Sequence, residues 1–325
     1  PRKYRIPGPR LIPGNGYYTL YETNSFGVTN GLSGSGEEVY IFSGDSDGHL
    51  TGYFQGFDFG PSAPNVTFGR YVNSIGQTQE VAQSANTLAA TNAYPLVGPV
   101  VINEIMYHPP DLFLSGAATE NFRDEFIELR NISGAEVLLY DTSYPANRWT
   151  IEKAVDFTFP IGASLLPNGY ALVVSFDPAQ EASALSAFRA RYGLSETVPI
   201  YGPYDGHLAD EGERLELRKP GQVNPNTGLA PMVLVDRVDY LPTNPWPATA
   251  SGSGASLQRR VASEFGNDPT NWVAAGPSAG GERVSGTPPT ITAQPQPVTT
   301  PEDSSASFAV SVDGRTAYVT DEGSN

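Results

Sequence analysis

The sequence contains no cysteine, which excludes a disulfide framework and a thiolate metal site. Only three histidines and two methionines are present, so little material exists for transition-metal chemistry. Basic residues are also scarce, because 19 Lys and Arg stand against 35 Asp and Glu, giving a formal net charge of −16. Nucleic acids and anionic membranes are bound through basic faces, so neither is an expected partner. No run approaches the roughly 18 apolar residues of a membrane span, so membrane insertion is not expected either.

What the sequence has in abundance is turn formers and aromatic residues. It holds 34 Gly and 29 Pro among 325 residues, with 17 Tyr and 15 Phe, whereas charged residues make up only 17%. Val, Ile and Thr are spread in short runs between these turns. This composition is typical of short strands joined by many turns, and it predicts an all-β fold.

Self-comparison reveals two copies of one unit. Three blocks recur in the same order, namely residues 11–22 with 165–176, 31–43 with 207–219, and 66–74 with 255–263. The second block aligns without a gap and places Gly36 on Gly212, and the third places Arg70 on Arg259. Each block is a turn followed by an alternating strand, so the copies are predicted to be successive hairpins of one all-β unit.

The second copy has strands that the first copy lacks. The segments "VVINEIMYHP" from Val100 and "DEFIELRNIS" from Asp124 have no counterpart before residue 97. We therefore expect an incomplete first β-sandwich over residues 1–97, called the first copy below. A complete sandwich is expected over residues 98–286, called the second copy.

Two further segments have their own patterns. Residues 177–194 combine Pro178 in the first turn, an Ala-rich body and Gly193 as C-cap, which predicts one short surface helix. Residues 287–325 begin as a Pro/Thr-rich linker and continue into the alternating pattern of a truncated immunoglobulin-like segment. Disorder is expected for the polar residues 313–325.

The ordered blocks of the second copy resemble the bacterial branch of the lamin-tail domain family. The resemblance covers about Val100 to Gly281 and, as a C-terminal portion only, residues 4–94. It implies tandem immunoglobulin-like β-sandwiches without catalytic residues, acting as accessory modules of secreted or surface proteins. The closing Thr-Pro-Gly…Asn pattern of the family is present only as "GPSAGG" from Gly276. The blocks are Ile102–Ile105, Glu125–Leu129, Phe159–Pro160, Leu166–Tyr170, Gly212–Leu217, Pro245–Pro247 and Ser256–Arg259.

Four residues in the first strands of the second copy are candidates for catalysis. Carboxylates on neighbouring strands can act as acid and as nucleophile or base in glycoside cleavage. The alternative is that strand glutamates accept hydrogen bonds from loops and close the sandwich. The residues are Glu104, His108, Glu125 and Glu128. A serine hydrolase is not predicted, because the Gly/Ser loop from Ser251 does not lie in a strand-turn-helix context.

Two other kinds of site suggest themselves. "DSDGHL", with Asp45 and Asp47, begins like a calcium loop but lacks its closing glutamate, and the same residues suit a plain hairpin turn. Trp149, Tyr204 and Trp246 are candidates for stacking on a carbohydrate, although such aromatic residues also close the ends of small cores. Calcium is thus an optional cofactor and none is required.

Two functional hypotheses follow. The first is a non-catalytic extracellular or cell-surface module for adhesion, spacing or substrate targeting, with a glycan, a cell-wall polymer or another protein surface as partner. The second is a hydrolase of esters or polysaccharides that uses the strand carboxylates. An incomplete first sandwich also predicts self-association, or docking of the strand near residues 305–312 onto it.

Overall fold

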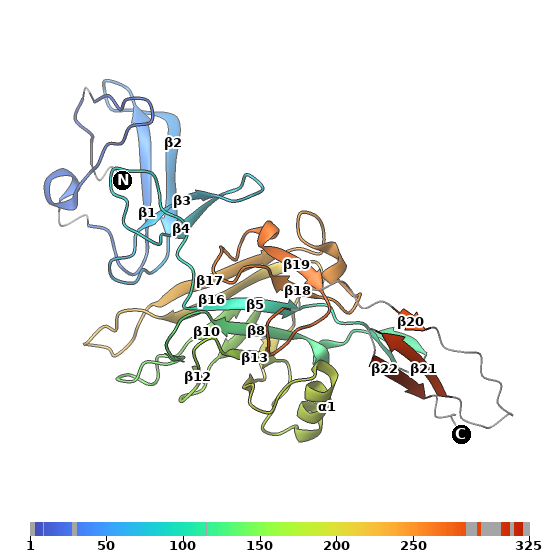
Figure 1. The fold of residues 1–325 in the computed structure, drawn as a ribbon. Helices are drawn as coiled ribbons and strands as arrows, with labels where there is room; N and C mark the ends of the chain where they lie inside the picture. Colours follow the sequence, from blue (N-terminus) through green and yellow to red (C-terminus); the bar gives the residue numbers. More distant parts are fainter. Residues whose placement is uncertain are drawn as a thin grey trace. The chain divides into compact units, whose positions relative to one another are not determined.

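The computed structural model describes residues 4–8, 10–27, 31–114, 116–283, 291–293, 307–312 and 315–320. It divides into two compact units, Pro1–Glu282 and Arg283–Asn325 (Figure 1). Strands dominate the described residues, with one short α-helix, so the prediction of an all-β fold is confirmed. No helix among these residues is both long and apolar enough to cross a bilayer.

The first copy contributes two hairpins and a short π-helical turn. Its elements are η1 (Glu22–Phe26), β1 (Glu37–Gly44), β2 (Leu50–Phe59), β3 (Phe68–Val72) and β4 (Thr78–Ala82).

The second copy holds most of the strands. Its elements are β5 (Val100–Met106), β6 (Leu112–Leu114), β7 (Ala117–Thr119), η3 (Phe122–Asp124), β8 (Phe126–Asn131), β9 (Val137–Leu138), β10 (Thr150–Lys153), β11 (Val155–Thr158), β12 (Ser164–Leu165), β13 (Tyr170–Val174), α1 (Ala182–Tyr192), β14 (Ile200–Tyr201), β15 (Asp205–Gly206), β16 (Glu213–Pro220), β17 (Met232–Tyr240), η4 (Ala248–Ala250), β18 (Ser256–Arg259), η5 (Pro269–Asn271) and β19 (Trp272–Ala275).

Two sheets of the second copy enclose the main core. A five-stranded sheet has the order β15-β11-β10-β16-β17, and a six-stranded sheet has the order β14-β13-β8-β5-β18-β19. The core takes alternate residues from both sheets, among them Ile127 and Leu129 of β8 and Leu215 and Leu217 of β16. Such alternation is what a strand with one face on a sandwich core requires.

The six-stranded sheet is covered on its outer face as well. A second apolar cluster contains Met106, Phe126 and Leu172 from the strands and Phe188 from α1. As a result every residue of β5 is buried, including its polar ones. The sequence predicted the helix correctly at its C-terminus, where Gly193 adopts a left-handed C-cap with φ of 63°.

The internal repeat is visible in the backbone. Gly36 and Gly212 precede β1 and β16 with φ of 99° and 98°. The residues that follow, Glu37 and Glu213, pair with Phe59 and Tyr240 at the same point of the partner strand. Hairpins β1-β2 and β3-β4 therefore correspond to β16-β17 and β18-β19.

A polar contact between the hairpins is also repeated. In the second copy Arg259 of β18 donates to the carboxylate of Asp236 on β17 at 2.5 Å, and both side chains are buried. The aligned Arg70 of β3 donates to Gln55 of β2 at 3.1 Å, in an exposed setting. The repeat therefore includes this side-chain contact between the two hairpins as well as the backbone.

The predicted strand after the Pro-Gly-Tyr turn forms in one copy only. In the second copy it is β13, which pairs with β8 and β14. In the first copy residues 17–21 are not a strand, so that prediction is wrong. The reason is that the first copy has no equivalent of β8, and an isolated strand has no partner for its backbone groups.

The unit from Arg283 onward contains β20 (Ile291–Ala293), β21 (Ser307–Val312) and β22 (Arg315–Thr320) in one antiparallel sheet. Residues 315–320, within the range for which disorder is expected, pair with β21 as the strand β22. The other residues of that range lie outside the described part. β21 pairs along its length with β22, and β20 pairs with its C-terminal end at Ser311 and Val312. Docking of the strand near residues 305–312 onto the first copy stays a prediction.

Removing one partner of the Arg259–Asp236 pair is expected to destabilise the second copy strongly. Asp236→Ala leaves a buried guanidinium unpaired, so the free energy of unfolding should fall by about 3–5 kcal/mol. Urea unfolding followed by tryptophan fluorescence measures this, since all three tryptophans, Trp149, Trp246 and Trp272, lie in the second copy. The control Glu196→Ala breaks an ion pair with Arg189 in which Glu196 is 88% exposed, and about 0–1 kcal/mol is expected. Equal losses for the two variants would contradict this role.

Candidate functional site

Glu104 and Glu128 come together on the six-stranded sheet. They are direct cross-strand partners between β5 and β8. By strand alternation they share the outer face with Met106 and Phe126, because Ile127 points to the main core. Both glutamates are fully buried.

The closing segment, residues 276–280, supplies donors to both carboxylates. The backbone N–H of Ser278 donates to the two oxygens of Glu104 at 3.1 and 3.2 Å, and its hydroxyl donates at 2.9 Å. The N–H of Gly280 donates to Glu128. Residues 276–280 thus lie over the carboxylate pair.

Side chains of neighbouring strand residues donate further hydrogen bonds to the pair. Ser256 donates its hydroxyl to Glu104 at 2.5 Å, and Gln258 donates from its side-chain amide at 3.4 Å. Asn103 donates to Glu128 at 2.7 Å. Glu104 therefore accepts five hydrogen bonds inside the protein, and Glu128 accepts two.

Burial has a marked electrostatic effect on this pair. Loss of hydration, followed by the nearby charge of Glu104, raises the pKa of Glu128 to about 8. Loss of hydration also raises the pKa of Glu104, against the hydrogen bonds that it accepts from Ser256 and Ser278. Two facing carboxylates without a buried cation between them favour retention of a proton.

Glu125 lies apart from the pair. Its carboxylate accepts the hydroxyl of Tyr204 at 2.6 Å and the N–H of Leu208 at 3.1 Å. Burial raises the pKa of Glu125 to about 7, although these two hydrogen bonds lower it. This carboxylate fixes the loop around residues 204–208 to the start of β8.

His108 joins a different set of side chains, one that the sequence did not reveal. Its Nδ1 lies 2.9 Å from the hydroxyl of Ser251 and 3.4 Å from a carboxylate oxygen of Asp210. A serine hydrolase needs Ser and Asp on different ring nitrogens, so that one accepts a proton while the other donates. Here both oxygens approach the same nitrogen, and the arrangement holds three loops together. The four candidate catalytic residues are therefore spread over three separate places.

The proposed stacking residues are not available to a ligand. Trp149, Tyr204 and Trp246 are 5%, 4% and 5% exposed, and all three belong to the main core. The prediction that they form a platform is wrong, because the sandwich needs their large apolar surfaces to fill its ends.

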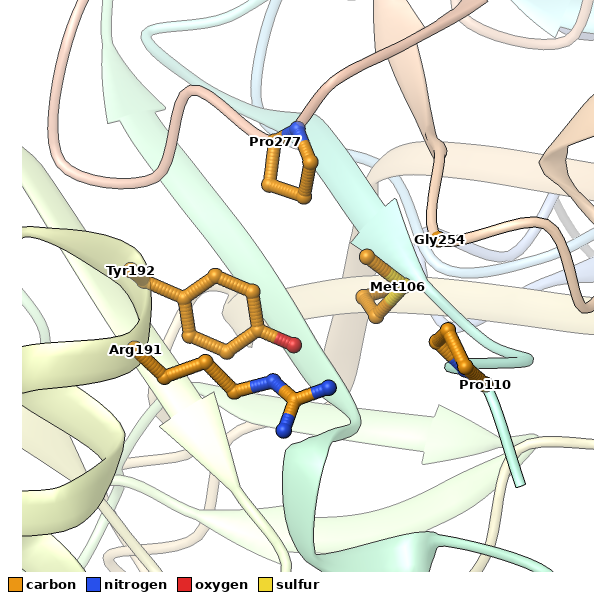
Figure 2. Close-up of a pocket in the computed structure, with 6 residues that line it drawn as sticks. All are labelled: Met106, Pro110, Arg191, Tyr192, Gly254 and Pro277. Atoms are coloured by element: carbon orange, nitrogen blue, oxygen red, sulfur yellow. The ribbon is translucent and has the colours of Figure 1, made fainter. Parts of the chain in front are cut away.

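A cavity of about 240 Å³ opens beside the end of β5 (Figure 2). Arg191 and Tyr192 of α1 lie on one side of it, with Met106 and Pro277 opposite. Arg191 forms an ion pair with the carboxylate of Asp124 at 2.9 Å, and the hydroxyl of Tyr192 donates to the carbonyl of Asp124 at 2.8 Å. The polar groups at this cavity are thus engaged with the protein.

A second cavity, of about 460 Å³, lies against β11 and β14. Phe157 and Tyr201 are half-buried in its lining. Asp177, also in the lining, accepts the N–H of Ala179 at 2.8 Å, so it serves the turn before α1.

The loop with Asp45 and Asp47 is a hairpin turn between β1 and β2. Asp45 accepts the N–H of His49 at 2.8 Å, and its own N–H donates to the carbonyl of His49 at 2.9 Å. Asp47 is exposed. No group of three or more His, Asp or Glu among the described residues is arranged to hold a metal ion. Calcium binding at this turn stays a prediction.

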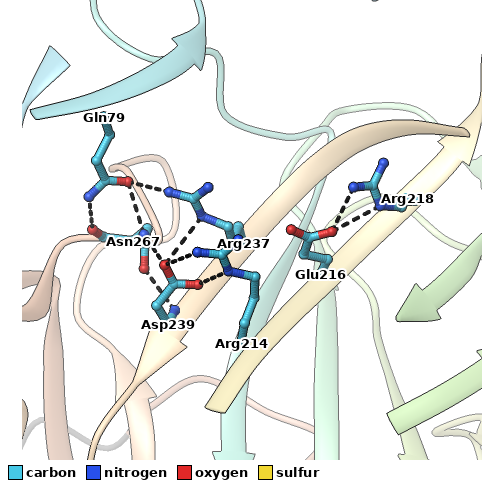
Figure 3. A network of polar contacts seen from close by, with 7 residues as sticks. All are labelled: Gln79, Arg214, Glu216, Arg218, Arg237, Asp239 and Asn267. Carbon is cyan, nitrogen blue, oxygen red and sulfur yellow. Dashed lines mark hydrogen bonds and ion pairs between the residues drawn. The ribbon is translucent and has the colours of Figure 1, made fainter. Parts of the chain in front are cut away.

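Part of the outer face of the five-stranded sheet is occupied by the first copy (Figure 3). Gln79 of β4 accepts a hydrogen bond from Arg237 of β17 at 2.7 Å and donates to the carbonyl of Asn267 at 3.1 Å. Nearby, the N–H of Ser74 donates to Asp268 at 2.9 Å. Glu216 and Arg218 form an ion pair at 2.7 Å farther along the sheet, where Gln79 does not reach.

Comparison with known proteins yields little. No protein-family profile matches the chain, and no curated protein matches it either. The crystal structure of a DUF4876 family protein from Bacteroides thetaiotaomicron is similar at 11% identity and a TM-score of 0.33, covering 71% of this chain and 85% of that one. This similarity is too low to carry an argument, and the resemblance to lamin-tail domains stays a prediction.

Because burial raises the pKa of Glu128, its contribution to the stability of the fold is expected to fall as the pH rises. The pKa of Glu128 is about 8 in the folded chain against an ordinary value of 4.5, so between these values the folded state binds more protons. The contribution of Glu128 to stability is therefore fully present below about pH 4.5 and is lost as the pH rises through about 8. Glu128→Gln imitates the protonated side chain. We expect it to gain stability relative to the parent chain on going from pH 5 to pH 8.5, measured by urea unfolding.

The matched control is Glu136→Gln, which changes an exposed glutamate of the same copy. Its stability should differ from that of the parent chain by the same amount at both pH values. A Glu128→Gln variant with equally unchanged behaviour would contradict a raised pKa at this position.

Proposed function

We propose that this chain is a non-catalytic accessory module of a secreted or surface bacterial protein, serving adhesion, spacing or substrate targeting. The observation that carries the proposal is the engagement of the candidate carboxylates. Glu104 and Glu128 are fully buried and accept hydrogen bonds from the closing segment. A general base or nucleophile must reach a substrate atom at hydrogen-bond distance, and these oxygens are covered by backbone.

The other candidate residues support the same function. Glu125 is bound by Tyr204 and Leu208, and both oxygens near His108 share a single ring nitrogen. Acid and base catalysis needs groups that converge on one open position. These groups hold loops at separate places instead. The partners that suit such a module are a glycan, a cell-wall polymer or another protein surface.

A hydrolase assay tests this function directly. We expect no turnover of ester or polysaccharide substrates by the parent chain above that of heat-unfolded protein, and no difference for Glu104→Gln or Glu128→Gln. The two variants should still fold, as judged by circular dichroism. Turnover by the parent chain that either variant abolishes at an unchanged melting temperature would overturn the proposal and establish the hydrolase.

A further inference from the structure

One face of hairpin β1-β2 carries three adjacent aromatic rings. Tyr40 and Phe42 alternate on β1, and Phe54 on β2 is the cross-strand partner of Phe42. Their ring centroids lie 5.7–6.3 Å apart, and Phe42 and Phe54 are stacked at an interplanar angle of 27°. The residues are 38%, 53% and 55% exposed. We call these three residues the aromatic strip.

The repeat shows that the aromatic strip is not part of a core. The gapless alignment places Val39 and Ile41 on Leu215 and Leu217, which are fully buried in the main core of the second copy. Tyr40 and Phe42 alternate with these residues and therefore point to the opposite side of the hairpin. Completing the first sandwich would cover Val39 and Ile41 and would leave the aromatic strip outside.

The second copy has charged residues where the first has aromatic ones. The positions of Tyr40 and Phe42 are occupied there by Glu216 and Arg218, which form the ion pair drawn in Figure 3. The outer face of the equivalent hairpin, β16-β17, thus folds with a charged pair in place of the two aromatic rings. Folding therefore does not require aromatic rings at these two positions, and their exposed apolar surface points to binding.

The ring of Tyr40 lies against the backbone of the neighbouring strand. A Cβ placed on Gly56, which faces Tyr40 across the hairpin, would lie 2.4 Å from a ring carbon of Tyr40. Only glycine allows the ring to lie against the strand at that distance. The hydroxyl of Tyr40 donates to Asp58 at 3.0 Å, which fixes the edge of the ring.

Charge selects among the molecules that stack on aromatic rings. Glu38 and Asp58 are cross-strand partners on the same side as Tyr40, and both are exposed. Together with the formal net charge of −16 they repel polyanions, which excludes nucleic acids and acidic polysaccharides. Their carboxylate oxygens accept hydrogen bonds from hydroxyl groups. A sugar ring offers an apolar C–H face for the rings and hydroxyls for the carboxylates.

We propose that the aromatic strip Tyr40, Phe42 and Phe54 binds a neutral polysaccharide by ring stacking, with Glu38 and Asp58 accepting hydrogen bonds from sugar hydroxyls. This inference rests on the proposed function and gives that function a ligand class. The strip is short and open, so it binds a chain from the side and does not enclose a single sugar.

Affinity gel electrophoresis in three soluble neutral polysaccharides, xyloglucan, hydroxyethylcellulose and mixed-linkage β-glucan, tests the inference. The decisive variant combines Tyr40→Glu with Phe42→Arg, which installs the pair that the second copy already carries. We expect at least one of the three polysaccharides to retard the parent chain and the variant to bind it at least tenfold more weakly. Polygalacturonate should retard neither protein.

The control Phe113→Ala removes an aromatic residue that is 80% exposed but lies on β6, away from the strip. It should bind like the parent chain, and all variants should keep the parent melting temperature. Equal binding by the double variant and the parent chain would overturn the inference, as would absence of retardation in all three polysaccharides.

Two further outcomes separate this inference from its alternatives. Sedimentation that reveals a dimer of the parent chain and a monomer of the double variant would assign the strip to a second copy of this chain, against the inference. If the chain neither binds sugar nor turns over a substrate, the polysaccharide inference is contradicted and the proposed non-catalytic function is not. Turnover that depends on Glu104 or Glu128 would contradict the proposed non-catalytic function.

Discussion

The buried Arg259–Asp236 pair is the contact on which the sandwich depends. Arg259 belongs to the six-stranded sheet and Asp236 to the five-stranded sheet, so the pair connects the two layers. Asp236 also accepts the N–H of Ile102 at 2.9 Å, and Arg259 donates to the carbonyl of the same residue at 3.0 Å. These bonds satisfy β5 where its register shifts between Ile102 and Glu104. Because a buried charge is costly without its partner, the pair fixes one alignment of the sheets.

The buried carboxylates on the outer face of β5 and β8 also need partners. The register shift lets Glu104 face outward, and the outer face is covered by α1 and the closing segment. Buried carboxylates there must accept hydrogen bonds or hold a proton, and they do so by binding Ser278 and Gly280. Residues that look like catalytic machinery in the sequence thus have a use in the fold. In the first copy the three rings of the aromatic strip remain open to solvent, as do Val39 and Ile41 on the other face of the same hairpin.

Much of the fold could be predicted from the sequence because its signals are local. Turn residues, strand alternation and the repeat depend on short stretches, so Gly36 and Gly212 could be matched by aligning the two copies. The site could not be predicted as well. Whether Glu104 faces a core or a cover depends on the distant segment 276–280, and the approach of Ser251 to His108 joins residues 143 positions apart. The exposure of Tyr40 and Phe42 could not be predicted either. The alternating pattern of β1 does not indicate which of its two faces is buried.

Hydrogen exchange at the closing segment tests the central claim, that the carboxylates of Glu104 and Glu128 hold this segment as part of the fold. We expect the amides of Ser278 and Gly280 to be protected as strongly as those of β5 and β8, and Glu104→Ala with Glu128→Ala, which removes the acceptors, to lower their protection first. Rapid exchange at these two amides in the parent chain, with β5 and β8 protected, would describe a movable lid over accessible carboxylates. That result would contradict a structural role for the two carboxylates.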